Sequence, residues 1–111
     1  MRSLTVSDSF RAFVLEQLEE LGAVSARSMF GGVGLYHEDV FFGIIAADIL
    51  YLKVDARSRA DYEALGMRAF SPYPERSGSM QYYEVPLAVL ESPIELAVWA
   101  RRAVAAASDA G

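Results

Sequence analysis

Cysteine is absent from the sequence, and histidine occurs only once, at His37. Without cysteine the chain can form no disulfide bond, no thiolate nucleophile and no cysteine-based zinc site. The single imidazole lies in the run His37-Glu38-Asp39, where neighbouring side chains on an extended chain point in opposite directions. We interpret this run as a solvated hairpin turn, and we expect the protein to hold no metal ion and no cofactor.

Long apolar runs are also missing. No run reaches the roughly 18 residues that a membrane-spanning helix requires. The residues from Met1 to Thr5 are not followed by the apolar segment that is typical of a signal peptide. These absences predict a cytoplasmic protein that does not associate with membranes.

Basic residues are fewer than acidic ones. The chain has 10 lysines and arginines against 15 aspartates and glutamates, which gives a formal net charge of −5. General nucleic-acid binders are usually strongly basic. Only residues 53–76 lean positive, with five basic residues against four acidic ones. We therefore expect the chain alone not to bind duplex DNA.

The apolar content, by contrast, is high enough for one core. The chain has 111 residues, of which 53% are hydrophobic, so it can fold as a single domain over residues 1–111 without a metal or a disulfide. Ser7 or Thr5 can cap a first helix, and Gly22 can end it. The apolar residues between them recur at steps of three and four, which predicts one buried helical face. These residues are Phe10, Phe13, Val14, Leu18 and Leu21.

A strand-like pattern follows this helix. Apolar, aromatic and β-branched residues fill Met29–Tyr36, Val40–Ile45 and Ile49–Val54, and the connections between these runs have hairpin length. Short connections imply antiparallel pairing. Within the third run, Leu50 and Leu52 alternate with Tyr51 and should face the core.

The second half predicts two helices separated by strands. A helix should run from Asp55 or Ser58 to Leu65, and short strands should follow at Met67–Phe70 and Met80–Val85. The segment Ser92-Pro93-Ile94-Glu95 combines a capping box with proline at the first helical position, which predicts the start of the last helix. The order is α-β(3)-α-β(2)-α, which indicates an α+β fold: an antiparallel sheet with helices mainly on one face.

The same residues carry a family resemblance. Met29-Phe30-Gly31-Gly32-Val33-Gly34-Leu35-Tyr36 resembles the signature that opens the N-terminal domain of the TfoX/Sxy competence-regulator family. Further matching blocks follow in the family's order at Val40–Ile45, Leu50–Asp55, Phe70–Tyr73, Tyr82–Pro86 and Trp99–Ala103. The resemblance implies a fold of the type shared with secretion chaperones. It also implies a regulatory role, because the longer members regulate natural competence together with the cAMP receptor protein. Those members carry a second, C-terminal domain, whereas this chain ends at Gly111, so we expect a stand-alone N-terminal domain.

Two motifs are interpreted as structural. Gly31, Gly32 and Gly34 could suggest a phosphate-binding loop, but such a loop leads into a helix N-terminus, and here a strand continues. We interpret these glycines as a bulged or closely approached strand. Trp99 shares the apolar stripe of the last helix and should be largely buried.

The candidate interaction face contains Tyr51, Lys53, Tyr82 and Tyr83. Tyrosine is enriched in protein interfaces, so we expect this face to bind a protein partner, with a transcription regulator as the candidate, and to form a homodimer. The alternative is a small enzyme or ligand-binding protein, in which a desolvated Lys53 acts as base or nucleophile beside the tyrosines. A stacking platform for single-stranded nucleic acid, which would add Tyr36, Phe42 and Tyr73, is disfavoured because the chain is acidic.

Overall fold

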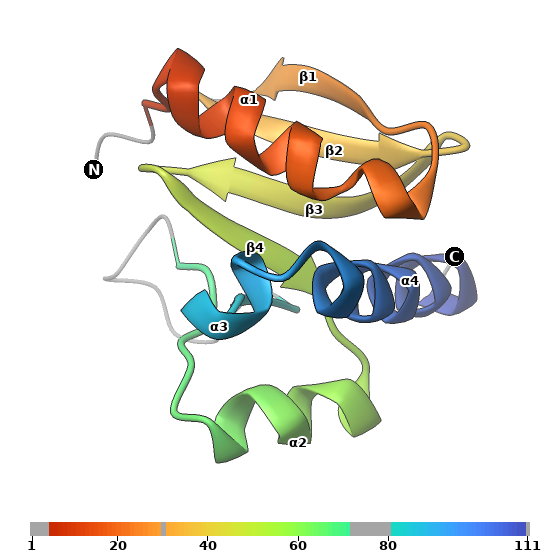
Figure 1. Cartoon of the computed structure of the whole chain (residues 1–111). Coiled ribbons are helices and arrows are strands. Elements are labelled where there is room, and N and C mark those ends of the chain that lie inside the picture. The colour runs from red at the N-terminus through yellow and green to blue at the C-terminus, as the bar shows by residue number, and fades with distance from the viewer. Residues whose placement is uncertain (1–4, 30, 72–80, 111) are drawn as a thin grey trace.

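The computed structural model describes residues 5–29, 31–71 and 81–110 (Figure 1). A helix opens the described chain, four strands follow, and a second helix, a fifth strand and two further helices complete it. The strands form one sheet in the order β1-β2-β3-β4-β5, and every neighbouring pair is antiparallel. The predicted α+β class is confirmed.

The first helix, α1 (Asp8–Gln17), begins where the sequence predicts. Phe10 donates its backbone N–H to the Ser7 hydroxyl, 3.2 Å away, so Ser7 is the N-cap. A short 3-10 turn (Glu19–Leu21) follows, and Gly22 ends it with φ 106°. Val14 and Leu18 are fully buried, whereas Phe13, predicted to share their face, is 37% exposed.

The sheet consists of β1 (Ser25–Met29), β2 (Gly32–His37), β3 (Val40–Ala46), β4 (Ile49–Lys53) and β5 (Tyr82–Glu84). Two residues connect β2 to β3, and two connect β3 to β4. All four have positive φ, as the tightest hairpin turns require: Glu38 (49°), Asp39 (67°), Ala47 (52°) and Asp48 (58°).

The strand count on each side of the second helix differs from the predicted α-β(3)-α-β(2)-α order. The run predicted as one strand from Met29 to Tyr36 is divided, because Gly31 has φ 84° and allows the chain to reverse between β1 and β2. Residues 67–70, predicted as a strand, form a single bridge between Ala69 and Tyr83. Four strands therefore precede α2, and one follows it. Met80, the predicted start of that last strand, lies outside the described residues.

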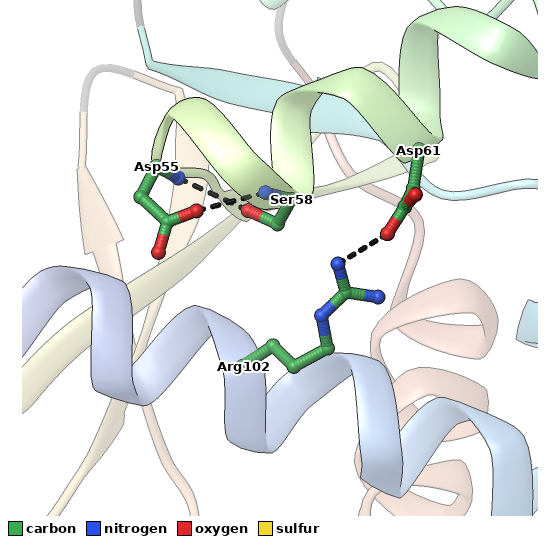
Figure 2. A network of polar contacts seen from close by, with 4 residues as sticks. All are labelled: Asp55, Ser58, Asp61 and Arg102. Atoms are coloured by element: carbon green, nitrogen blue, oxygen red, sulfur yellow. Dashed lines mark hydrogen bonds and ion pairs between the residues drawn. The ribbon is translucent and has the colours of Figure 1, made fainter.

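Helices α2 (Ala56–Ala64), α3 (Leu87–Leu90) and α4 (Pro93–Ala110) complete the fold. At the start of α2, Asp55 and Ser58 form a reciprocal capping box (Figure 2). The hydrogen bond from the backbone N–H of Ser58 lowers the pKa of Asp55. At the start of α4, Glu95 donates its N–H to the Ser92 hydroxyl, as the capping pattern predicts.

The main core lies between the sheet and the helices α1, α3 and α4, which share one side of the sheet in Figure 1. We call this side the helix face. The side chains from the sheet and those from the helices form one buried cluster. Its fully buried members include Val14, Leu18, Leu35, Phe42, Ile45, Leu52, Leu96 and Ala100.

A bulge sets which aromatic residues of β3 reach this core. The β2–β3 register shifts between Leu35 and Tyr36, so β3 has one extra residue at this point. Phe42 turns to the helix face and is fully buried, while its neighbour Phe41 lies in a second cluster on the opposite side. Regular alternation from Ile45 would place Phe41 on the helix face, so the extra residue reverses the pattern and places Phe42 there instead.

Candidate interaction face

The side of the sheet opposite the main core, which we call the outer face, holds the second apolar cluster. In β4 the alternation of side chains buries Leu50 and Leu52 in the main core and places Tyr51 and Lys53 on the other side. In β5 the same alternation places Tyr82 on the outer face. The structure thus brings together three of the four residues predicted to form an interaction face.

Three rings on the outer face form a continuous row. Tyr36 stacks on Phe41 with ring centroids 5.2 Å apart, and Phe41 contacts Tyr82 at 5.6 Å. The guanidinium of Arg27 lies 4.7 Å from the Tyr36 centroid, and Lys53 Nζ lies 5.4 Å from the Tyr82 centroid. Both distances are typical of cation–π contacts. The row therefore has a positive charge at each end.

The side chains of the outer face differ in how far they are buried. A second aromatic pair joins Tyr51 and Phe70, with ring centroids 4.9 Å apart. Ile44, Phe70 and Tyr82 are buried, whereas Tyr36, Phe41 and Tyr51 remain partly exposed. Phe70 comes from the segment after α2, so part of the chain covers the end of this face near β5. Glu84 lies opposite Tyr51 in the sheet and places one carboxylate on the same side.

Burial changes the acid–base properties of Tyr82. Desolvation, with a smaller contribution from the nearby Tyr36, raises the pKa of Tyr82. Its hydroxyl is therefore neutral near pH 7 and is a poor nucleophile there. Lys53 lies over the face of the Tyr82 ring and is partly exposed.

Tyr83 does not belong to the outer face, because it alternates onto the helix face of β5. Its hydroxyl donates a hydrogen bond to Glu63 Oε2 of α2, 2.8 Å away, and this bond raises the pKa of Tyr83. Its ring lies 5.9 Å from that of Tyr62. Tyr83 therefore connects the sheet to α2 and is separated from Lys53 by the thickness of the sheet.

Trp99 takes part in the contact between α2 and α4. It is partly buried, and its ring meets Tyr62 edge to face with centroids 4.8 Å apart. Figure 2 shows Arg102 of α4 pointing at Asp61 of α2, where Nη2 lies 2.5 Å from Oδ2. The Arg102 guanidinium also lies 5.6 Å from the Trp99 centroid. Trp99 thus has a packing role on the helix face.

The glycines of the family signature lie where backbone and side chains come close. A Cβ at Gly32 would lie 2.7 Å from the carbonyl oxygen of Ile45, and one at Gly34 would lie 2.9 Å from Met29 Cε. Gly31 occupies the left-handed region between β1 and β2. No helix N-terminus follows these glycines, because β2 continues to His37.

His37 contacts the connection between α1 and β1. Its Nδ1 lies 2.9 Å from the Ala23 carbonyl oxygen, and its Nε2 lies 3.5 Å from Glu38 Oε2. Within the described residues, no group of three histidine, aspartate or glutamate side chains could hold a metal ion. In the same part of the chain, no helix is long and apolar enough to span a membrane.

Sequence reasoning missed Arg27 and Phe41 as members of the outer face. Arg27 lies on β1, a strand that the sequence pattern does not indicate, and the face on which Phe41 lies depends on the bulge between β2 and β3. Phe42, considered for a stacking platform, is in the main core. Tyr73, another of those rings, lies outside the described residues.

Two comparisons with known proteins agree with each other. A family model described as "TfoX N-terminal domain" matches residues 16–107. The chain is also 31% identical over 80 residues to the DNA transformation protein TfoX1 of Aliivibrio fischeri. That alignment covers 71% of this chain and 38% of the relative, so the chain matches well under half of the relative's length.

Proposed function

The chain belongs to the TfoX N-terminal domain family, and we propose that it is a non-catalytic regulatory domain that acts in the cytoplasm by binding another protein. The observation that carries this proposal is the aromatic row on the outer face, in which Tyr36 and Phe41 are partly exposed, with Arg27 at one end and Lys53 at the other. Aromatic residues and arginine are enriched in protein interfaces. The outer face would bind a protein surface that presents apolar side chains to the rings and carboxylates to the two cations.

The arrangement of the tyrosines favours this role over catalysis. A base or nucleophile at Lys53 would need nearby tyrosines as partners, but Tyr83 lies on the other side of the sheet. The pKa of Tyr82 is raised above the ordinary tyrosine value of about 10, so its phenol is no better a base or nucleophile near pH 7 than that of an exposed tyrosine. A pair consisting of an ammonium group and a neutral phenol can bind carboxylates or carbonyl groups, which suits an interface.

The charge of the chain favours a protein over DNA as the direct partner. The net charge is −5, and DNA affinity comes largely from counterion release at several Lys or Arg contacts. Glu63 and Asp61 lie among the basic residues of α2, and Arg102 is paired with Asp61. Sequence recognition would therefore come from a DNA-binding protein, with this domain held to it.

The test measures the fluorescence anisotropy of a labelled promoter duplex at about 150 mM salt, where charges are screened within about 8 Å. The probe protein is the cAMP receptor protein of the organism that encodes the chain, because the family resemblance implies that partner. We expect the anisotropy to stay unchanged when the chain alone is added to the duplex. When the receptor protein already occupies the duplex, we expect addition of the chain to raise the anisotropy further. Binding of the chain alone below about 1 μM, with a steep dependence on salt, would contradict the proposal.

Charge-reversal variants show whether the outer face is responsible. Arg27→Glu combined with Lys53→Glu should abolish the second rise in anisotropy. Arg57→Glu combined with Arg59→Glu makes the same change in charge on exposed positions of α2 and is the matched control. Equal loss in both variants would mean that overall charge, and not the outer face, determines binding.

A further inference from the structure

The sheet has one covered edge and one open edge within the described residues. At β5, Phe70 donates its N–H to the Tyr82 carbonyl oxygen and Glu84 donates to the Arg68 carbonyl oxygen, both at 2.8 Å. Residues 68–70 therefore cover the outer edge of β5. At the other end of the strand order, β1 pairs with β2 only.

The hydrogen bonds next to β5 determine which way the backbone groups of each strand point. Val85 donates its N–H to the Leu50 carbonyl oxygen, so Leu50 directs its backbone groups toward β5. In an antiparallel sheet these directions alternate along a strand. Tyr51 therefore directs its N–H and C=O toward β3, where its partner is Ile44.

The same alternation continues to the open edge. Because the backbone N–H and C=O groups of Ile44 point toward β4, those of Ile45 point toward β2, where its partner is Val33. Gly34, the next residue, then points toward β1, where its partner is Arg27.

The neighbours of Arg27 on β1 must point the other way. The N–H and C=O groups of Ala26 and Ser28 therefore point away from the sheet. An independent contact agrees with this direction: Arg11 Nη2 of α1 donates to the Ala26 carbonyl oxygen at 3.4 Å, so a side chain from outside the ladder reaches this oxygen.

The composition of β1 suits close approach by another strand. Ser25, Ala26 and Ser28 are small, and the β1–β2 register runs from Ser25 to Met29 without a bulge. Natural sheets usually protect an edge with proline, lysine, a bulge or a covering segment. Among the described residues, Arg11 reaches this edge, and its hydrogen bond to Ala26 is long.

We infer that β1 pairs antiparallel with β1 of a second copy of this chain, which forms a two-fold dimer with one continuous sheet. A second copy fits because the edge at β5 is covered: pairing the open edges of two copies uses both, so the assembly closes at two chains. If β1 instead bound some other part of a second copy, the β1 edge of that second copy would remain exposed. The inference rests on the backbone groups of β1 and not on the rings of the outer face, although Arg27 lies on β1 as well as at one end of that row.

Charge disfavours a register centred on Arg27, and we place the axis at Ala26. A two-fold axis at Arg27 would place two guanidinium groups directly opposite each other, and like charges in that position are destabilising. An axis at Ala26 places Ala26 opposite its own copy and Arg27 opposite Ser25 of the second chain. In this register the two Ala26 residues exchange both backbone hydrogen bonds, with Cα atoms about 5.5 Å apart.

Single-cysteine variants test both the dimer and its register, because the chain has no cysteine of its own. At Ala26→Cys the Cα separation lies within the range of a disulfide, so mild oxidation should give a covalent dimer. At Ser28→Cys the two copies would be roughly 14 Å apart, given a rise of about 3.4 Å per residue, so oxidation should leave monomers. Faster cross-linking at position 28, or none at position 26, would overturn the inference.

Sedimentation equilibrium of the whole chain gives the second test. Ala26→Pro removes an N–H that points away from β2 and should weaken dimerisation at least about tenfold, while circular dichroism remains unchanged. Arg11→Ala removes the competing donor and should tighten the dimer severalfold. Tyr51→Glu, on the outer face, is the control and should leave the dimer intact. A monomeric wild-type chain, or a loss of the dimer in Tyr51→Glu alone, would refute pairing through β1. If Ala26→Pro does not fold, the cross-linking of the cysteine variants still decides whether β1 pairs with β1.

Discussion

Tyr62 of α2 and Trp99 of α4 pack nearly at right angles, with ring centroids 4.8 Å apart and an interplanar angle of 85°. Tyr62 is 2% exposed and is among the largest fully buried side chains of the protein. It is also the main apolar anchor of α2, because the only other buried residue of that helix is Ser58. The attachment of α2 therefore depends mainly on one ring and on the polar contacts around it.

Removal of the Tyr62 ring should cost about 3–5 kcal/mol of unfolding free energy, the usual range for a buried aromatic side chain. The measurement is urea unfolding of Tyr62→Ala. A double-mutant cycle with Trp99→Ala should give a coupling of about 0.5–1.5 kcal/mol, as expected for an edge-to-face pair. The matched control is Tyr62→Ala with Phe13→Ala, because Phe13 lies on α1, is partly exposed and has no ring contact with Tyr62. Coupling of similar size in both cycles would contradict a direct contact.

Alkaline pH should loosen the same contact. Burial raises the pKa of Tyr62 well above its usual value of about 10. The folded state thus holds this proton more tightly than the unfolded state, so the stabilisation is fully present below pH about 10. It is lost progressively as pH rises from there toward the pKa of the folded protein.

Urea unfolding between pH about 8 and pH about 11 checks this dependence. Tyr62→Phe keeps the ring and removes the titrating group, so its stability should fall less steeply with pH than that of the wild type. Tyr83 also has a raised pKa, through its hydrogen bond to Glu63, and should retain part of the slope in this variant. Identical slopes in the wild type and Tyr62→Phe would show that the Tyr62 hydroxyl is not desolvated.

A single substitution in the turn between β3 and β4 should increase the stability of the protein. Ala47 has φ 52°, a conformation that costs an L-residue about 1–2 kcal/mol and that asparagine tolerates better. Ala47→Asn should raise the unfolding free energy by about 0.5–1 kcal/mol. Asp48 should stay unchanged, because its carboxylate accepts the Ser7 N–H at 2.8 Å and connects this turn to the start of α1.

Thermal unfolding of a contrasting pair tests the backbone argument. Ala47→Val introduces a β-branched side chain at a positive φ and should lower stability by more than about 1 kcal/mol. The two variants differ little in exposed area, so opposite shifts identify the backbone conformation as the cause. A stabilising valine would mean that the positive φ is not maintained in solution.

Much of the fold could be predicted from the sequence because its signals are local. The capping box before Pro93 specifies the start of α4, and the alternation in β4 separates Leu52 from Tyr51 without any tertiary information. The hairpin connections at Glu38-Asp39 and Ala47-Asp48 follow from their length, although neither contains glycine.

The missed features depend on tertiary context. β1 was not predicted because Ser25, Ala26 and Ser28 have neither the β-branched nor the aromatic character of a central strand. The bulge that turns Phe42, and not Phe41, toward the core is a mismatch between two strands and cannot be inferred from either one alone. Of the interaction face, Tyr51, Lys53 and Tyr82 are on one side, whereas Tyr83, adjacent to Tyr82, is necessarily on the other.

Two glycines of the family signature should respond differently to the same substitution. A Cβ at Gly32 would lie 2.7 Å from a backbone atom, the Ile45 carbonyl oxygen, and the strand pair β2–β3 would have to separate to accept it. Overpacking of this kind costs about 1–3 kcal/mol, and we expect Gly32→Ala to be in the upper half of that range. At Gly34 the nearest atom is Met29 Cε, the end of a flexible side chain, so a rotamer change can relieve most of the clash. Gly34→Ala should therefore cost less than about 1 kcal/mol, since the loss of unfolded-state entropy offsets part of the strain.

Urea unfolding of the two variants and of the wild type measures both losses of stability. Equal losses would mean that the close approach of β3 to Gly32 is not what selects glycine at that position, and a greater loss at Gly34 would locate the tight contact on the outer face, between Met29 and Phe41.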